Sequence, residues 1–136
     1  MISIKSQRFG ELQIEEEEII EFPLGIPGIP FNRFIIKELI DPVKWFIAVE
    51  DSDIAMLIVS PFKFFPTYGF EISDEIVETL EAETEDELEV YVSLLKYNDG
   101  VAANLKSPFV INKRKKIGVQ IILEDERYKF REPIKK

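Results

Sequence analysis

Short apolar runs separated by turn-forming residues are the feature that most constrains this chain. The longest purely apolar run is Ile54–Val59, and eight prolines and six glycines are spread along the 136 residues. Runs of this length suit β-strands, whereas a helix needs roughly 10–12 residues of periodic pattern. The sequence therefore predicts short strands joined by tight turns.

Alternating or β-branched residues mark the expected strands. The run Ile54–Val59 has no polar face and predicts a central, fully buried strand, paired with Trp45–Val49 through the turn Asp51–Asp53. Asp99-Gly100 is a second hairpin signal. Runs with strand character lie at residues 2–5, 9–14, 19–22, 34–36, 45–49, 54–59, 88–94, 101–105, 109–112, 118–123 and 127–131. From these runs we expect about nine or ten separate strands, since the shortest runs can belong to turns or to a neighbouring strand.

One short helix is expected near residues 73–81. Ser73 is a good N-cap, and the negative charges of Asp74 and Glu75 in the first turn interact favourably with the helix dipole. Ile76 and Leu80 then lie on one face at i, i+4 spacing. Thr84–Glu87 also fits a capping box, but the alternating residues that follow it indicate a single tight turn entering a strand.

Two proline-rich segments interrupt the strand pattern. Phe22–Pro30 holds three prolines and two glycines, which exclude both a helix and a central strand. Pro61–Tyr68 is bracketed by prolines and dense in aromatics, and we call it the aromatic segment. Its phenylalanines either plug the end of a barrel or form an anchor patch for a partner. The sequence leaves both interpretations open.

Many short strands with regular turn signals favour an all-β fold. We expect a compact antiparallel β-barrel-like single domain over residues 1–136, with one short helix. Closing the sheet would also remove exposed strand edges.

The composition excludes several classes of function. No histidine and no cysteine occur, which removes a Ser-His-Asp triad, a thiolate nucleophile and a zinc–cysteine site. No phosphate-binding glycine motif is present, and the acids Asp51 and Asp53 lack the glycine and glutamate that a calcium loop requires. We expect neither an enzyme nor a cofactor or metal.

The overall charge argues for a protein partner. The net charge is −9, which disfavours direct binding to nucleic acid or to an anionic membrane. No stretch approaches the ~20 apolar residues of a membrane span, and the N-terminus lacks the apolar core of a signal peptide. A cytoplasmic location is expected.

The charge is distributed unevenly. Residues 1–112 carry a balance of −14 and residues 113–136 one of +5. Ser73–Glu89, which we call the acidic segment, contains nine acids and no base. It is either a solvated face or a surface that attracts a basic partner and repels RNA. The run Lys113–Lys116 is either a hairpin tip or a phosphate-binding patch.

Five motifs in order along the chain resemble the FliW family of flagellar assembly factors. The family consensus reads F-P-x-G-I-P-G, a tryptophan strand with an acidic turn, P-x-x-F-F-P-x-Y, N-L-x-A-P and Y-x-x-R-x-P-[LI]. The corresponding segments here are Phe22–Gly28, Trp45-Phe46 with Glu50–Asp53, Pro61–Tyr68, Asn104–Pro108 with Asn112 and Gln120, and Tyr128–Ile134. Ile29, Ser60 and Ser107 depart from the residues common in the family.

The resemblance implies a regulatory function. FliW proteins bind the RNA-binding translational regulator CsrA and also bind flagellin. They hold CsrA off the flagellin message until accumulating flagellin removes them, and they act allosterically rather than by occupying the RNA site. The family fold is a compact antiparallel β-barrel-like structure, as expected here from the strand pattern.

We place the candidate partner surface on two segments and one turn. The hypothesis is that the acidic segment supplies a field that repels RNA phosphates and that the aromatic segment lies near the partner. The candidate residues are Phe64, Phe65, Pro66, Tyr68, Asn104, Lys106, Glu83, Glu85, Asp86 and Glu87. The rival interpretations are a structural barrel subunit with no regulatory role and a small carboxylate enzyme acting on a saccharide.

Overall fold

The computed structural model describes residues 1–134, which form eleven strands, one α-helix and three short 3₁₀ turns. The helix α1 spans Asp74–Leu80, and the 3₁₀ turns are η1 (Glu16–Glu18), η2 (Pro61–Lys63) and η3 (Glu85–Glu87). The strands are β1 (Ile2–Ser6), β2 (Gly10–Ile14), β3 (Ile20–Glu21), β4 (Arg33–Ile40), β5 (Val43–Ala48), β6 (Ala55–Val59), β7 (Leu88–Tyr97), β8 (Gly100–Ala103), β9 (Phe109–Asn112), β10 (Ile117–Gln120) and β11 (Glu132–Pro133).

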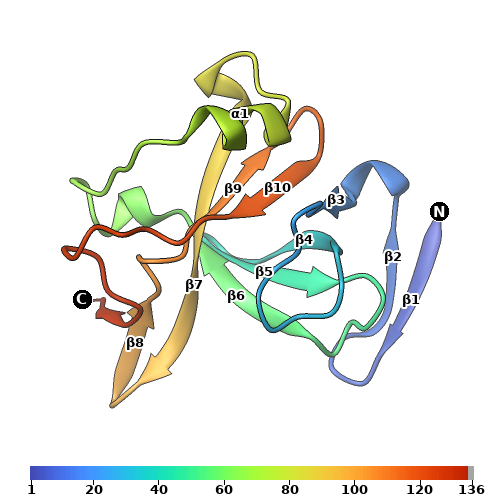
Figure 1. Ribbon diagram of the computed structural model, residues 1–136. Coiled ribbons are helices and arrows are strands. Elements are labelled where there is room, and N and C mark those ends of the chain that lie inside the picture. Colours follow the sequence, from blue (N-terminus) through green and yellow to red (C-terminus); the bar gives the residue numbers. More distant parts are fainter. Residues whose placement is uncertain (135–136) are drawn as a thin grey trace.

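The large sheet closes into a barrel-like ring, as expected from the sequence. Its order is β7-β6-β5-β4-β3-β10-β9, and β9 pairs back onto the first half of β7 (Figure 1). The ten-residue β7 makes this closure possible, because its second half pairs with β6 and β8. All pairings are antiparallel except that of β3 with β10, which is parallel at Ile117 and Glu21.

Four phenylalanine rings fill the inside of the ring. Phe22 lies edge-on to Phe34, Phe46 and Phe109 at centroid distances of 5.4, 5.6 and 6.1 Å. Phe34 and Phe46 stack at 4.5 Å. Aromatic pairs in these geometries add to the stabilisation from area burial, so this cluster is the centre of the core.

The β1–β2 hairpin packs on the outside of the ring, at the right of Figure 1. Its inward residues Ile4 and Ile14 form a buried cluster with Ile35 of β4 and Ile47 of β5. This arrangement follows the period-2 alternation of the N-terminal residues.

A second core lies on the other side of the ring and holds the aromatic segment in place. Tyr68 is 5% exposed, and its hydroxyl donates a hydrogen bond of 2.7 Å to the carbonyl of Leu105. The Tyr128 hydroxyl accepts from the N–H of Gly69 and donates to the carbonyl of the same residue. These bonds fasten the aromatic segment to the 104–108 turn and to the C-terminal segment.

Two strand predictions are wrong. Residues 127–131 form a turn, because the Asp125 carboxylate and carbonyl accept from the N–H groups of Arg127 and Tyr128 and bend the chain. The strand follows later as β11, which pairs with β8. The predicted strand at 118–123 ends at Gln120.

The strand β6 is central but only partly buried, which corrects the prediction of full burial. Ile58 and Val59 are buried inside, whereas Ala55, Met56 and Leu57 are half-buried. The reason is that Ala55 lies with Trp45 at the margin of the cluster under the β1–β2 hairpin. No helix within residues 1–134 is long and apolar enough to cross a membrane.

Candidate protein-binding site

A cleft of about 470 Å³ opens where the aromatic segment meets the acidic segment. Pockets of roughly 300–1,000 Å³ are typical of ligand sites. One wall is formed by Ser60, Phe62, Gly69, Phe70 and Ile72. The facing wall comes from η3 and the start of β7 and consists of Glu85, Leu88, Glu89, Val90 and Tyr91.

The aromatic wall owes its shape to the prolines. Pro61 opens the η2 turn, and its carbonyl accepts from the N–H groups of Phe64 and Phe65. The rings that follow Pro61 differ in exposure, and the Phe62 ring lies 6.1 Å from that of Tyr68. Phe65 packs against the core around Tyr68, whereas Phe62 and Phe64 face solvent.

Burial therefore fits the plug interpretation for Phe65 and Tyr68, and the anchor interpretation stays a prediction for the exposed residues. Tyr68 is buried and cannot offer its ring to a partner, so its placement at the partner surface is corrected by the fold. Burial, and to a smaller extent Tyr128, raise the pKa of Tyr68. Phe64 and Pro66 remain exposed and free to contact another molecule.

The helix and the η3 turn position the acidic wall. Ser73 caps α1 as predicted, with its hydroxyl accepting from the N–H of Ile76, and Glu81 ends the helix in the left-handed region with a φ of 53°. Residues 85–87 form a single turn before β7, also as predicted. The Thr84 side chain makes no capping bond.

Glu87 has a structural rather than a surface position. Its carboxylate accepts from the N–H of Glu83 and from Nδ2 of Asn112, and its side chain is only 14% exposed. Asn112 is fully buried, and its Nδ2 also donates to the carbonyl of Leu80 at 2.8 Å. Asn112 thus joins the end of α1 to the η3 turn.

The basic run lies against the acidic segment. Lys113–Lys116 forms the turn between β9 and β10, which confirms the hairpin-tip interpretation. Arg114 lies 3.8 Å from Glu83 and 3.5 Å from Glu87, and Lys115 lies 3.8 Å from Glu81. Three of the nine acids are therefore partly neutralised.

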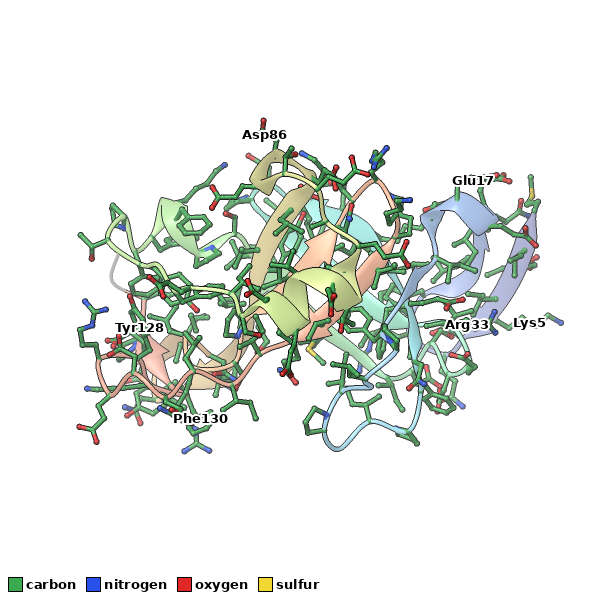
Figure 2. The ribbon with its side chains drawn as sticks, turned by 45° about the horizontal axis from the view of Figure 1, so that its top comes forward. Lys5, Glu17, Arg33, Asp86, Tyr128 and Phe130 are labelled. Atoms are coloured by element: carbon green, nitrogen blue, oxygen red, sulfur yellow. The ribbon has the colours of Figure 1, made fainter. Side chains whose placement is uncertain are left out.

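The acids beside the cleft lie outside this ion-pair cluster. Within residues 1–134, Glu85, Asp86 and Glu89 form no ion pair. Figure 2 shows the Asp86 side chain extending outward from the edge of the molecule. The Tyr91 hydroxyl donates to Glu89 at 3.3 Å, and burial, followed by the Glu89 charge, raises the pKa of Tyr91. Tyr91 is therefore a neutral donor at physiological pH.

The structure brings only part of the predicted site together. Glu85 lines the cleft, and Glu83 and Asp86 lie exposed beside it. Asn104 builds a turn instead, because its Oδ1 accepts from the N–H of Ser107, and neither it nor Lys106 lines the cleft.

Sequence reasoning named as candidates none of the six apolar residues that line the cleft, which are Phe62, Phe70, Ile72, Leu88, Val90 and Tyr91. Phe62 and Phe70 flank the proline-bracketed core of the aromatic segment, while Leu88 and Tyr91 lie in a strand. The available signal was the aromatic segment itself, since Phe62 lies within its η2 turn and Phe70 follows it by two residues. Leu88 and Tyr91 carried no signal, because apolar strand residues normally belong to the core.

Comparison with known protein families gives a match over almost the whole chain. The model of the FliW protein family matches residues 3–134. The flagellar assembly factor FliW of Caldicellulosiruptor bescii is 41% identical over 132 residues, covering 94% of this chain and 87% of that protein. The FliW of Alkaliphilus metalliredigens is also 41% identical, covering 92% of this chain and 81% of that protein.

A more distant relative and a solved structure agree with these matches. The FliW of Bacillus licheniformis is 35% identical over 136 residues, covering 96% of this chain and 95% of that protein. A crystal structure of the flagellar assembly factor FliW superimposes with a TM-score of 0.90 at 31% identity. That alignment covers 96% of this chain and 95% of the crystallised one.

Proposed function

The chain belongs to the FliW family, and from this premise we propose that it is a flagellar assembly factor that switches between two protein partners. One partner is a CsrA-type translational regulator, which it antagonises, and the other is flagellin. The observation that carries the proposal is the family match over residues 3–134, with relatives that are flagellar assembly factors.

We also propose that the protein is not an enzyme. The chain has no histidine and no cysteine to supply a general base or a thiolate near neutral pH. Its carboxylates at the cleft mouth are accessible and suited to attracting cations. We propose that it works by binding alone and in the cytoplasm, where a translational regulator and newly made flagellin would meet it.

The mechanism that we propose for RNA exclusion is electrostatic. Glu83, Glu85 and Asp86 are exposed at one edge of the molecule. Docking this edge beside an RNA-binding surface places negative charge near the phosphates, within a Debye length of about 8 Å at physiological salt. Repulsion then weakens RNA binding without occupation of the RNA site.

Titration calorimetry with purified CsrA-type regulator and flagellin, each alone and then in competition, tests the proposal. We expect both proteins to bind and flagellin to displace the regulator. Failure of both to bind would overturn the proposal. Binding of both at once, without competition, would remove the partner switch.

Charge substitution tests the mechanism. Replacing Glu83, Glu85 and Asp86 with glutamine should weaken RNA exclusion more than it weakens binding to the regulator. Glu87 is left unchanged, because its hydrogen bonds to Glu83 and Asn112 support the fold. Equal losses of docking and RNA exclusion would contradict the electrostatic mechanism.

A further inference from the structure

Exposed apolar side chains gather beside the cleft. Phe62, which lines the cleft, is 45% exposed, and Phe64 follows it on the surface. Ile40, at the end of β4, is 73% exposed. The β4–β5 turn lies near η2, since Nζ of Lys63 is 3.9 Å from Oδ2 of Asp41. Exposed apolar groups in a contiguous patch mark interaction sites more often than scattered ones do.

The cleft is deep enough for one large side chain. Its walls present the ring of Phe70 and the aliphatic side chains of Ile72, Leu88 and Val90. Its volume of about 470 Å³ exceeds what a single leucine or phenylalanine side chain occupies. An apolar group that entered here would be removed from water on several sides.

The charge around the cleft has one sign. Glu85 and Glu89 lie in its wall without ion-pair partners in residues 1–134, and Asp86 follows Glu85 at the rim. Glu89 also borders a smaller hollow that holds Lys44, Lys113 and Lys116, so the excess of negative charge is greatest at Glu85 and Asp86. The rim therefore complements a positively charged partner segment and repels an acidic one.

We propose that the cleft is the docking point for a segment of a protein partner that carries one bulky apolar side chain next to lysine or arginine. The apolar side chain enters between Phe62 and Leu88, and its basic neighbours face Glu85 and Glu89. The exposed rings of Phe62 and Phe64 contact the rest of the segment. This inference rests on the proposed function as a protein-binding factor and adds the chemistry that the partner must present.

Selection from a displayed library of random 12-residue peptides tests this chemistry without assuming a partner. We expect the selected peptides to carry a bulky apolar residue within two positions of lysine or arginine. Their affinity for the Phe62→Ser and Glu85→Lys variants should fall roughly tenfold or more, as for an anchor residue in a pocket. Synthetic copies of the selected peptides serve as the measured ligands.

Two control variants match these changes elsewhere on the surface. Phe130→Ser removes a ring that is 54% exposed and does not line the cleft. Glu17→Lys inverts an exposed charge in η1, and Figure 2 shows Glu17 well separated from Asp86. Both control variants should bind the selected peptides with the same affinity as the unaltered protein.

The outcomes separate the two proposals. Peptides of acidic or mixed character, or equal affinity for cleft and control variants, would overturn the docking chemistry even if the regulator and flagellin bind. Peptides that depend on the cleft while neither purified partner binds would overturn the proposed function and leave the docking chemistry standing.

Discussion

Gly118 leaves no room for a side chain, because the ring of Phe22 occupies that space. A Cβ at Gly118 would lie 2.5 Å from Cζ of Phe22, and this ring is fully buried among three other phenylalanines. We therefore expect Gly118→Ala to lower the free energy of unfolding by about 1–3 kcal/mol, the usual cost of overpacking. Urea denaturation followed by tryptophan fluorescence measures the change.

Gly69→Ala is the matched control, since a Cβ there has open space and the backbone needs no positive φ. Its free energy of unfolding should stay within about 0.5 kcal/mol of the unaltered protein. An unchanged Gly118→Ala variant would mean that the Phe22 ring can move aside.

Tyr68 makes the free energy of unfolding depend on pH in the alkaline range. Because burial raises its pKa in the folded protein, the phenol stays protonated above pH ~10, where an unfolded tyrosine loses its proton. The unfolded state then binds fewer protons, so the free energy of unfolding is intact below pH ~10 and falls above it.

Tyr68→Phe should weaken this pH dependence while costing stability at neutral pH. The variant loses the hydrogen bond to the Leu105 carbonyl, which should lower the free energy of unfolding by about 1 kcal/mol at pH 8. Above pH ~10 its stability should fall less steeply, with the remaining fall due in part to Tyr91, whose pKa is also raised by burial. Denaturant titrations between about pH 8 and pH 11 test this, and identical slopes would contradict it.

Two short elements, α1 and η3, begin at residues that both look like N-caps in the sequence, but only one of these residues makes a capping hydrogen bond. Ser73 accepts a hydrogen bond from the N–H of Ile76, whereas Thr84 makes none from its side chain. Ser73→Ala should therefore lower the free energy of unfolding by about 1 kcal/mol. Thr84→Ala should lower the free energy of unfolding by no more than about 0.3 kcal/mol. Equal losses in urea denaturation would show that the Ser73 bond adds little.

Elements specified by local chemistry were predictable, and those specified by distant contacts were not. The bounds of β9 and the position of α1 follow from strand pattern and capping residues. The turn at residues 127–131 looks like a strand because Tyr128 and Phe130 alternate with charged residues. Local bonds from Asp125 bend the chain there, and the bonds of Tyr128 to Gly69, which lies 59 residues away, fix where the segment packs.

The candidate site shows the same limit at the scale of the whole molecule. The sequence marked the aromatic and acidic segments separately, but their meeting at the cleft depends on closure of the ring through β7 and β9. Asn112, at the end of β9, completes the arrangement by bonding to Leu80 and Glu87. Tyr68 is buried, unlike Phe64, because it packs with Leu105 and Tyr128 from distant parts of the chain.

The overall charge pattern predicts how fast a basic partner associates. Arg114→Gln removes the cation near Glu83 and Glu87 and makes the edge beside the cleft more negative. Arg127→Gln changes the net charge equally, but Arg127 pairs with Asp125 at 2.7 Å and precedes Tyr128, which Figure 2 shows well separated from Asp86.

We expect Arg114→Gln to raise the association rate constant with the CsrA-type regulator roughly two- to threefold at low salt, because steering follows the local field as well as the total charge. Arg127→Gln should have a smaller effect. The gain should disappear near 1 M salt, where the Debye length is about 3 Å. Stopped-flow measurements over a salt series test this, with thermal melts to confirm that both variants remain folded. Equal acceleration by the two variants would show that total charge alone governs the encounter, and the acidic edge would then have no special part in capturing the partner.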